Sequence, residues 1–282
     1  MGILQKIRSA VSVSFARVRS VGEDAREVRL NKDTGLIKIF ACLLMLSDHM
    51  GKMIFPHAWR LTAPEEWASV FPSDNIMRVI GRLAMPLFCY GIAVGCRYTR
   101  NIWKYALRLI GLGILVHPLY MVAMGHVPMG AFDWARDFYR VDRIYEFFFT
   151  KKLNILFTLA MGVLLIACYR SKSYVLLVLV SLLTWHMQGV LDYGYKGVLL
   201  ILLFYALLDR PLASFLAVFL FMLNWAMPSL LVTGRARANT EIYALLSLPL
   251  IYVPMKRRVR LPKWVFYAFY PGHLLLIYLL RL

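Results

Sequence analysis

The sequence has few charged residues, and acids are especially scarce. Of its 282 residues, 60% are hydrophobic and only 17% are charged, with a mean hydropathy of +0.62. A soluble domain has no use for that much apolar surface, so the composition predicts one polytopic membrane bundle. Only 15 acids stand against 33 lysines and arginines, a net charge of +18. Because these basic residues cluster between apolar runs, they indicate membrane topology, and no nucleic-acid partner is expected.

The motifs of several chemistries are also missing. All four cysteines lie in apolar runs and no CxxC pair occurs, so neither a disulfide framework nor a metal site is expected. The sequence contains no HEXXH, GxSxG, Walker or GxGxxG motif, and no His-x4-Asp of the glycerolipid acyltransferases. Kinase, metalloprotease and hydrolase activities are therefore disfavoured.

Apolar runs of membrane-spanning length recur along the chain. They predict an all-α transmembrane helix bundle of about nine spans, formed as a single domain by residues 33–282. The predicted spans are 36–56, 76–98, 103–124, 153–169, 174–190, 195–208, 212–232, 241–255 and 264–281.

Residues 1–32 form a different kind of segment. Apolar residues recur there at helical spacing, with lysines and arginines between them. This pattern predicts an amphipathic helix on the cytoplasmic membrane surface. The alternative is a transit peptide, because the first twenty residues are basic and contain no acid.

Basic loops alternate with mixed or acidic loops along the bundle, and the 233–240 loop is the one exception. Basic loops remain in the cytoplasm, so we expect the N-terminus there and the C-terminus outside. On this topology the long 126–152 loop lies on the outer face. Its interleaved aromatic and charged residues predict an interfacial segment, either a lid or an aromatic membrane anchor.

The first predicted span carries ionisable residues, which are costly in a bilayer and mark function. Lys38 and His49 are eleven residues apart, which places them on one helix face about 16 Å apart. Lys38 then lies at the cytoplasmic end and His49 in the outer half. We expect His49 to act as a general base, oriented by Asp48 or another carboxylate. The alternative is a buried histidine that bonds to a neighbouring helix.

Arg78 and Arg82 share a face at the outer entrance of the second span. They either hold an anionic group of the substrate or pair with Asp48 or Asp74. His273 follows a Pro-Gly pair in the last span. This pair leaves backbone polar groups without helical hydrogen bonds, and because lipid cannot satisfy them, they must face protein or a cavity.

Two further groups lie near opposite membrane surfaces. A cytoplasmic basic stripe either clamps phosphates or is ordinary positive-inside charge, and it consists of Arg97, Arg100, Lys104 and Arg108. Three polar residues at outer ends of spans either bind substrate or cap helices, and they are Asn154, Asp192 and Glu241.

Six short motifs occur in order between residues 36 and 280. They are Ile37-Lys38, Leu44-Met45…Asp48-His49, Gly81-Arg82-x-Ala84-x-Pro86-Leu87-Phe88, Asn154-Ile155-Leu156-Phe157, Tyr193-Gly194…Gly197 and Phe269-Tyr270…His273-Leu274. In order and spacing they resemble the TraX family, which is associated with N-terminal acetylation of conjugative pilin. The Lys-x10-His arrangement also resembles the Arg/Lys-x10-His signature of the broader transmembrane acyltransferase group.

The resemblance implies an acetyltransferase in the bacterial inner membrane. Such an enzyme moves acetyl groups from cytoplasmic acetyl-CoA to an acceptor beyond the lipid bilayer. His49 would deprotonate the acceptor, and Lys38 with the basic stripe would hold the phosphates of coenzyme A. Arg82 and His273 would stabilise the oxyanion or position the acceptor.

The sequence allows two alternatives each for the acceptor and for the function. The acceptor is either an envelope glycan hydroxyl or the N-terminal amine of a pilin, and the aromatic and charged 126–152 loop favours the glycan. The alternative function is a proton-coupled transporter with Asp48, His49 and Arg82 as its relay. Transporters usually show paired halves, and no internal repeat stands out here.

Overall fold

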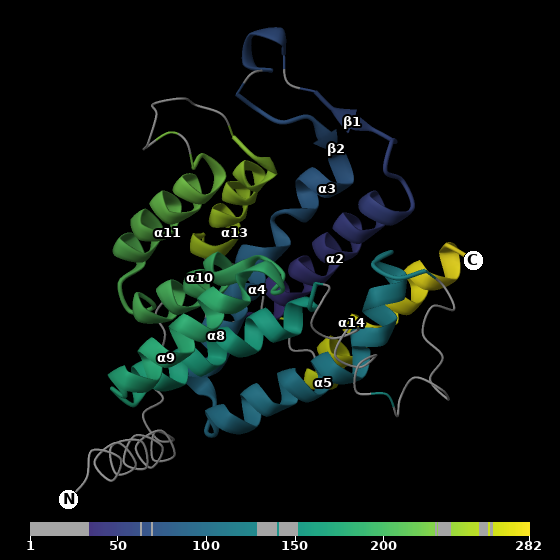
Figure 1. Ribbon diagram of the computed structural model, residues 1–282. Coiled ribbons are helices and arrows are strands. Elements are labelled where there is room, and N and C mark those ends of the chain that lie inside the picture. Colours follow the sequence, from purple (N-terminus) through teal and green to yellow (C-terminus); the bar gives the residue numbers. More distant parts are fainter. Residues whose placement is uncertain are drawn as a thin grey trace, which may run out of the picture.

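The computed structural model describes residues 34–62, 64–68, 70–128, 140, 152–228, 230, 238–253, 259 and 262–282. This part of the chain is almost wholly helical (Figure 1), which confirms the predicted all-α bundle. The predicted helix over 1–32 and most of the 126–152 loop lie outside the described residues.

Within the described ranges, helix is found at every predicted span. The α-helices are α2 (Thr34–Met53), α3 (Ile76–Gly81), α4 (Ala84–Tyr98), α5 (Ile102–Ala123), α8 (Ile155–Arg170), α9 (Tyr174–His186), α10 (Gly194–Ala206), α11 (Pro211–Ala226), α13 (Leu248–Tyr252) and α14 (Lys263–Leu280). The 3₁₀-helices are η1 (Glu65–Trp67), η2 (Met187–Gly189) and η3 (Thr240–Ser247). Strands β1 (Arg60–Leu61) and β2 (Asp74–Asn75) pair antiparallel, with Arg60 opposite Asn75.

Two of the predicted spans are not single α-helices. The second span is divided into α3 and α4 by a turn at Arg82 and Leu83. The eighth consists of η3 followed by α13. Breaks of this kind inside a helical segment often mark functional positions, since they redirect side chains and release backbone groups from helical hydrogen bonds.

The helices differ in their capacity to cross a membrane. Among the described residues, three segments are long and apolar enough, and they are Thr34–Met53, Ile76–Tyr98 and Ile102–Ala123. The other apolar helices have 10–17 residues, so the number of spans stays a prediction. Large apolar side chains such as Leu182 and Leu216 are exposed on α9 and α11, which suits a surface that faces lipid.

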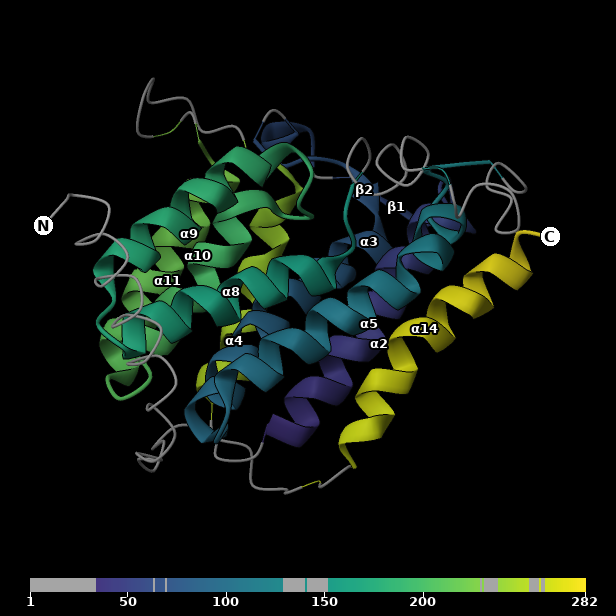
Figure 2. The same cartoon turned by 60° about the horizontal axis from the view of Figure 1, so that its bottom comes forward.

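The centre of the bundle is α4, which packs against α2, α8 and α10. Helix α14 lies beside α2 and α5 (Figure 2). It runs parallel to α2, because Lys38 lies over the ring of Phe266 near the start of both helices and His49 meets His273 further along. The first and last helices of the described bundle therefore build one site together.

Asparagine side chains begin four of the helical segments. Asn75, Asn101, Asn154 and Asn239 each accept a hydrogen bond from a backbone N–H two or three residues ahead, at 2.8–3.1 Å. These N-caps satisfy donors that the first turn of a helix leaves free. Asn154 is fully buried, and its Nδ2 also donates to the carbonyl of Gly113 at 2.8 Å. It therefore fixes the start of α8 against α5.

Gly81 lets α3 approach α2 closely at Asp48. A Cβ at this position would lie 2.7 Å from the Cα and 2.9 Å from the backbone nitrogen of Asp48. Since helix backbone cannot move aside as the tip of a side chain can, the contact requires glycine.

We expect Gly81→Ala to destabilise the protein by about 1–3 kcal/mol, because it overpacks this helix contact. Gly111→Ala is the matched control, since a Cβ there would meet nothing within 4 Å and alanine favours helix. A thiol-reactive dye that reports exposure of the four buried cysteines measures both unfolding midpoints in detergent. An unchanged midpoint for Gly81→Ala would contradict the close approach of α2 and α3.

Candidate active site

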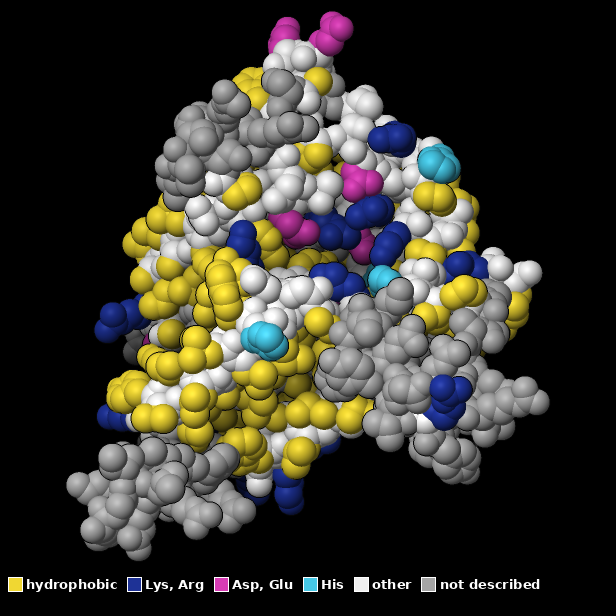
Figure 3. Space-filling view, in the orientation of Figure 1, with side chains coloured by type: hydrophobic (Ala, Val, Ile, Leu, Met, Phe, Trp, Pro, Cys, Tyr) yellow, Lys and Arg dark blue, Asp and Glu magenta, His cyan; other side chains and the backbone are white. Residues whose placement is uncertain are grey.

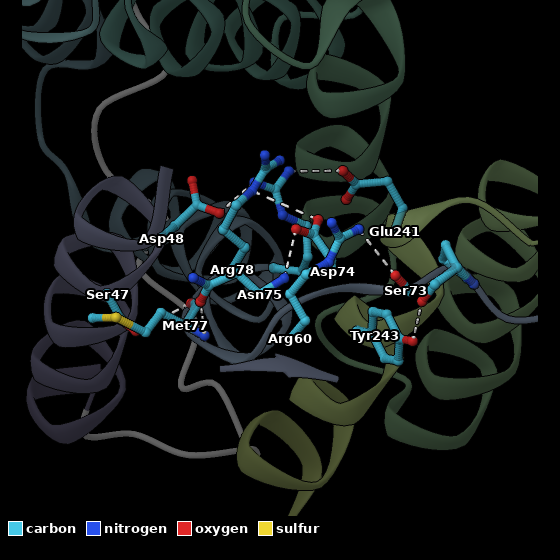
Figure 4. A network of polar contacts seen from close by, with 12 residues as sticks. Ser47, Asp48, Arg60, Ser73, Asp74, Asn75, Met77, Arg78, Glu241 and Tyr243 are labelled. Atoms are coloured by element: carbon cyan, nitrogen blue, oxygen red, sulfur yellow. Dashed lines mark hydrogen bonds and ion pairs between the residues drawn. The ribbon is translucent and has the colours of Figure 1, made fainter. Parts of the chain in front are cut away.

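A buried ion-pair network joins α2, η3 and the break between α3 and α4. Arg82 lies in the break, where its Nη2 donates to Asp48 of α2 and its Nη1 donates to Glu241 of η3 at 3.1 Å. The three side chains are only 11–17% exposed. Figure 4 shows Asp48 and Glu241 reaching the network from opposite sides. Of the two roles that the sequence left open for Arg82, pairing with Asp48 is the one observed.

Arg78 lies one helical turn before Arg82 and makes a separate ion pair. Its Nε is 3.6 Å from Oδ2 of Asp74, the first residue of strand β2, which directly precedes α3. The Asn75 side chain caps α3 and also donates to the carbonyl of Phe55 just beyond α2. These contacts hold the first turn of α3, and with it Arg78, against the end of α2 (Figure 4).

The two histidines singled out in the first and last spans contact each other. His49 Nδ1 and His273 Nε2 are 3.0 Å apart, and the rings stack with centroids 5.1 Å apart. Asp48 points instead to Arg82, because successive residues on a helix diverge by about 100°. The sequence left two arrangements open for His49, which were orientation by Asp48 or another carboxylate and a bond to a neighbouring helix. The contact observed is the second one, with His273 of α14.

The hydrogen-bond partners assign the protons of this pair. His273 Nδ1 lies 3.0 Å from the carbonyl of Phe269, which can only accept, so neutral His273 carries its proton on Nδ1. Its Nε2 then accepts from the Nδ1–H of His49. This leaves Nε2 of neutral His49 with a free lone pair. A general base requires a nitrogen in this state.

A polar cavity of about 520 Å³, here termed the His49 cavity, opens beside the histidine pair. Its charged lining residues are Asp48, Lys52, Arg78, Arg82, Lys152, Asp192, Lys196 and Glu241. Figure 3 shows lysine, arginine and acidic side chains gathered around a hollow on this face. Tyr193, Tyr195 and Trp225 add aromatic surface. The cavity thus offers charges of both signs next to the candidate base.

Asp192 lies outside the helices, in the turn between η2 and α10. Its backbone carbonyl accepts a hydrogen bond of 2.6 Å from the Thr158 hydroxyl, which fixes the turn. Burial raises the pKa of Asp192 to about 6, and Arg82 opposes this shift. A carboxyl that titrates near neutral pH beside a cavity is typical of a functional site.

A second cavity of about 570 Å³, the Lys38 cavity, opens toward the start of α2. Its walls are mostly apolar and come from α2, α4, α5, α8 and α14, with Lys38 and Arg108 as its basic side chains. The ammonium of Lys38 lies 5.7 Å from the centre of the Phe266 ring. The volume falls in the range of small-molecule sites, about 300–1,000 Å³.

The two cavities share four lining residues, which are Met45, Phe88, Ile155 and Tyr270. Met45 is one helical turn before His49 on the same face of α2. The cavities therefore adjoin at the depth of the histidine pair, one reaching toward each end of the bundle.

The structure gathers most of the predicted site residues. The His49 cavity is lined by His49, Asp48, Arg78, Arg82, Asp192 and Glu241, and the Lys38 cavity by Lys38. Other predicted residues line neither cavity. Asn154 caps α8, Arg97 pairs with Asp209 at 3.0 Å, and Arg100 and Lys104 are exposed. Of the basic stripe, Arg108 is the member that reaches a cavity.

Sequence reasoning gives no role to Lys52 or Tyr270, although Tyr270 belongs to the Phe269-Tyr270…His273-Leu274 motif. Lys52 follows His49 by three residues, so helical periodicity is a signal for it. Lys196 and Trp225 come from different helices and lie 6.0 Å apart as a cation–π pair, which no local pattern reveals. Over the ranges that the structure describes, no cluster of three or more histidines, cysteines or acids is arranged to bind a metal.

Together these features define an all-helical membrane protein with a charged cavity around paired histidines. The family model described as TraX protein matches residues 33–281, and the chain belongs to the TraX family. It is also similar to the probable fimbrial assembly protein FimC, serogroup H1, of Dichelobacter nodosus. The two are 24% identical over 260 residues, 86% of this chain and 92% of that protein. No solved structure gives a significant match.

Proposed function

We propose that the protein is a membrane acetyltransferase that moves an acetyl group from cytoplasmic acetyl-CoA to an acceptor outside. The observation that carries this proposal is the meeting of two cavities beside His49, whose Nε2 is free to accept a proton. Membership of the TraX family, which is linked to pilin acetylation, supports the same conclusion.

The Lys38 cavity suits the acetyl donor. Its apolar walls fit the arm that carries the thioester, and Lys38 and Arg108 are suited to bind phosphate groups. The parallel course of α2 and α14 supports an odd number of spans between them, with the two chain ends on opposite sides of the membrane.

The geometry supports direct general-base catalysis. Nε2 of His49 takes the proton from the acceptor as its oxygen or nitrogen bonds to the thioester carbonyl carbon. The carbon–sulfur bond then breaks, and the thiolate of coenzyme A leaves and receives the proton from His49. His273 holds Nδ1–H of His49 throughout, which stabilises the imidazolium that forms between the two steps.

The His49 cavity suits a polar acceptor. Carboxylates and the aromatic faces of Tyr193, Tyr195 and Trp225 are the groups that bind sugar hydroxyls and sugar rings. We therefore propose an envelope glycan hydroxyl as the acceptor. The N-terminal amine of a pilin is the second candidate, because the similar Dichelobacter nodosus protein is named for fimbrial assembly.

Coenzyme A should stabilise the purified protein. At a concentration 100 times its Kd, a ligand that binds only the folded state adds about 2.7 kcal/mol to the free energy of unfolding. Lys38→Ala should weaken binding by about 10- to 100-fold through loss of a charge-assisted phosphate contact, and Lys38→Arg should weaken it less. The unfolding midpoint in detergent, titrated with coenzyme A, measures both effects.

Lys196→Ala is the matched control, because Lys196 lines the other cavity and should leave this stabilisation intact. Equal stabilisation of Lys38→Ala and wild type would move the donor site elsewhere. A wild-type protein with no response to coenzyme A would favour the alternative function, a proton-coupled transporter in which Asp48, His49 and Arg82 form the relay.

A further inference from the structure

Tyr270 lies at the junction of the two cavities. Met45, Phe88 and Ile155, the other residues that line both, have apolar side chains. Among the described residues, the phenol hydroxyl of Tyr270 is therefore the one side-chain hydrogen-bond donor on this shared wall. Tyr270 also precedes His273 by three residues on α14, and the two rings meet edge to face with centroids 5.3 Å apart.

This hydroxyl is buried without a partner. The Tyr270 side chain is 4% exposed, and its oxygen forms no hydrogen bond with any described residue. A buried polar group left in this state costs about 1–3 kcal/mol. Tyr90 carries the same cost, and Tyr270 differs from it by lying on the wall that the two cavities share. The phenylalanine that would remove this cost has nearly the same shape.

The start of α8 faces the same point. Asn154 caps this helix, and Ile155, the first residue of α8, lines both cavities beside Tyr270. A helix N-terminus carries a partial positive charge. The Tyr270 hydroxyl and this partial positive charge therefore lie together where the cavities meet, and both favour a negatively charged oxygen there.

We infer that Tyr270 is a catalytic residue whose hydroxyl donates to the oxygen of the thioester carbonyl during transfer. The inference rests on the proposed acetyl transfer. As the acceptor bonds to the carbonyl carbon, the π pair moves onto the carbonyl oxygen, and Tyr270 stabilises that charge. The pair returns when the carbon–sulfur bond breaks and the thiolate leaves, so Tyr270 keeps its own proton while His49 carries the transferred one.

Tyr270→Phe tests this inference, with Tyr90→Phe as the matched control. Tyr90 is 1% exposed, and its hydroxyl is also buried without a hydrogen-bond partner among the described residues, but it lines neither cavity. We expect Tyr270→Phe to lower kcat by about 10²–10³-fold, as loss of one oxyanion donor does, with KM for acetyl-CoA unchanged. Tyr90→Phe should keep wild-type kinetics. Neither variant should lower the unfolding midpoint.

Two results would overturn the inference. One is transfer by Tyr270→Phe as fast as by Tyr90→Phe. The other is failure of Tyr270→Phe to accumulate in folded form, since the hydroxyl would then serve the fold. Absence of acetyl transfer by the wild-type protein would instead refute the proposed function, and this assignment would fall with it.

Discussion

Replacing His49 with alanine is expected to abolish most acetyl transfer while the protein still inserts and accumulates. Loss of one positioned general base typically lowers the rate by about 10²–10⁴-fold. His49 is the candidate for that base because its Nδ1–H bonds to His273 and its Nε2 is left free beside the cavity. Transfer of acetyl from labelled acetyl-CoA to membrane acceptors measures the effect.

The partner of His49 allows a finer test of the same account. His273→Gln retains a carbonyl oxygen that can accept from Nδ1–H of His49, whereas His273→Leu retains no acceptor. We therefore expect His273→Gln to keep more activity than His273→Leu. This order follows from control of the His49 tautomer and is not expected if His273 only fills space.

His186 provides the control for the histidine series. It ends α9, is exposed and lines neither cavity, so His186→Ala should transfer acetyl at the wild-type rate. Near-normal transfer by His49→Ala at normal protein levels would remove His49 from the mechanism.

Replacing Arg82 with glutamine is expected to cause the largest loss of stability, about 3–5 kcal/mol. Without the guanidinium, Asp48 and Glu241 would be two buried carboxylates facing each other with their cation removed. The triple variant Asp48→Asn, Arg82→Gln, Glu241→Gln removes all three charges, and we expect it to recover most of the lost stability. Unfolding midpoints in detergent compare the single and triple variants.

Arg97→Gln is the control for Arg82→Gln. Arg97 also pairs with a carboxylate, but Asp209 is 57% exposed, and exposed ion pairs contribute about 0–1 kcal/mol. We therefore expect a much smaller shift of the midpoint. Equal shifts for Arg82→Gln and Arg97→Gln would contradict the role of Arg82 as the buried centre of the network.

The positions of the helices follow from the sequence because apolar runs and caps are local signals. Asn154 illustrates the limit of such signals. Its position before an apolar run fits either a cap or a substrate ligand, and only the packing of α8 against α5 shows its side chain buried and bonded to Gly113. The break at Arg82 is similar, since the sequence shows Gly81 but not how closely α2 approaches it.

The partners of the ionisable residues depend on contacts between distant segments. His49 and His273 are 224 residues apart, and Arg82 and Glu241 are 159 apart. Sequence reasoning singled out each of these residues, but it left the partner of His49 open between Asp48, another carboxylate and a neighbouring helix. Helix geometry directs neighbouring side chains apart, so Asp48 turned to Arg82 and His49 to a different helix.

Mass spectrometry of envelope polysaccharide and pilin from cells that lack the gene tests the proposed acetyl transfer most directly. These cells are complemented with wild type, with His49→Ala or with an empty vector, and protein levels are matched. We expect an acetyl group on one of these acceptors that appears only with the wild-type protein. A glycan acetyl would support the proposed acceptor, and a pilin N-terminal acetyl would replace it with the second candidate. Identical acetylation of both acceptors in all three strains would contradict the assignment of this protein as an acetyltransferase.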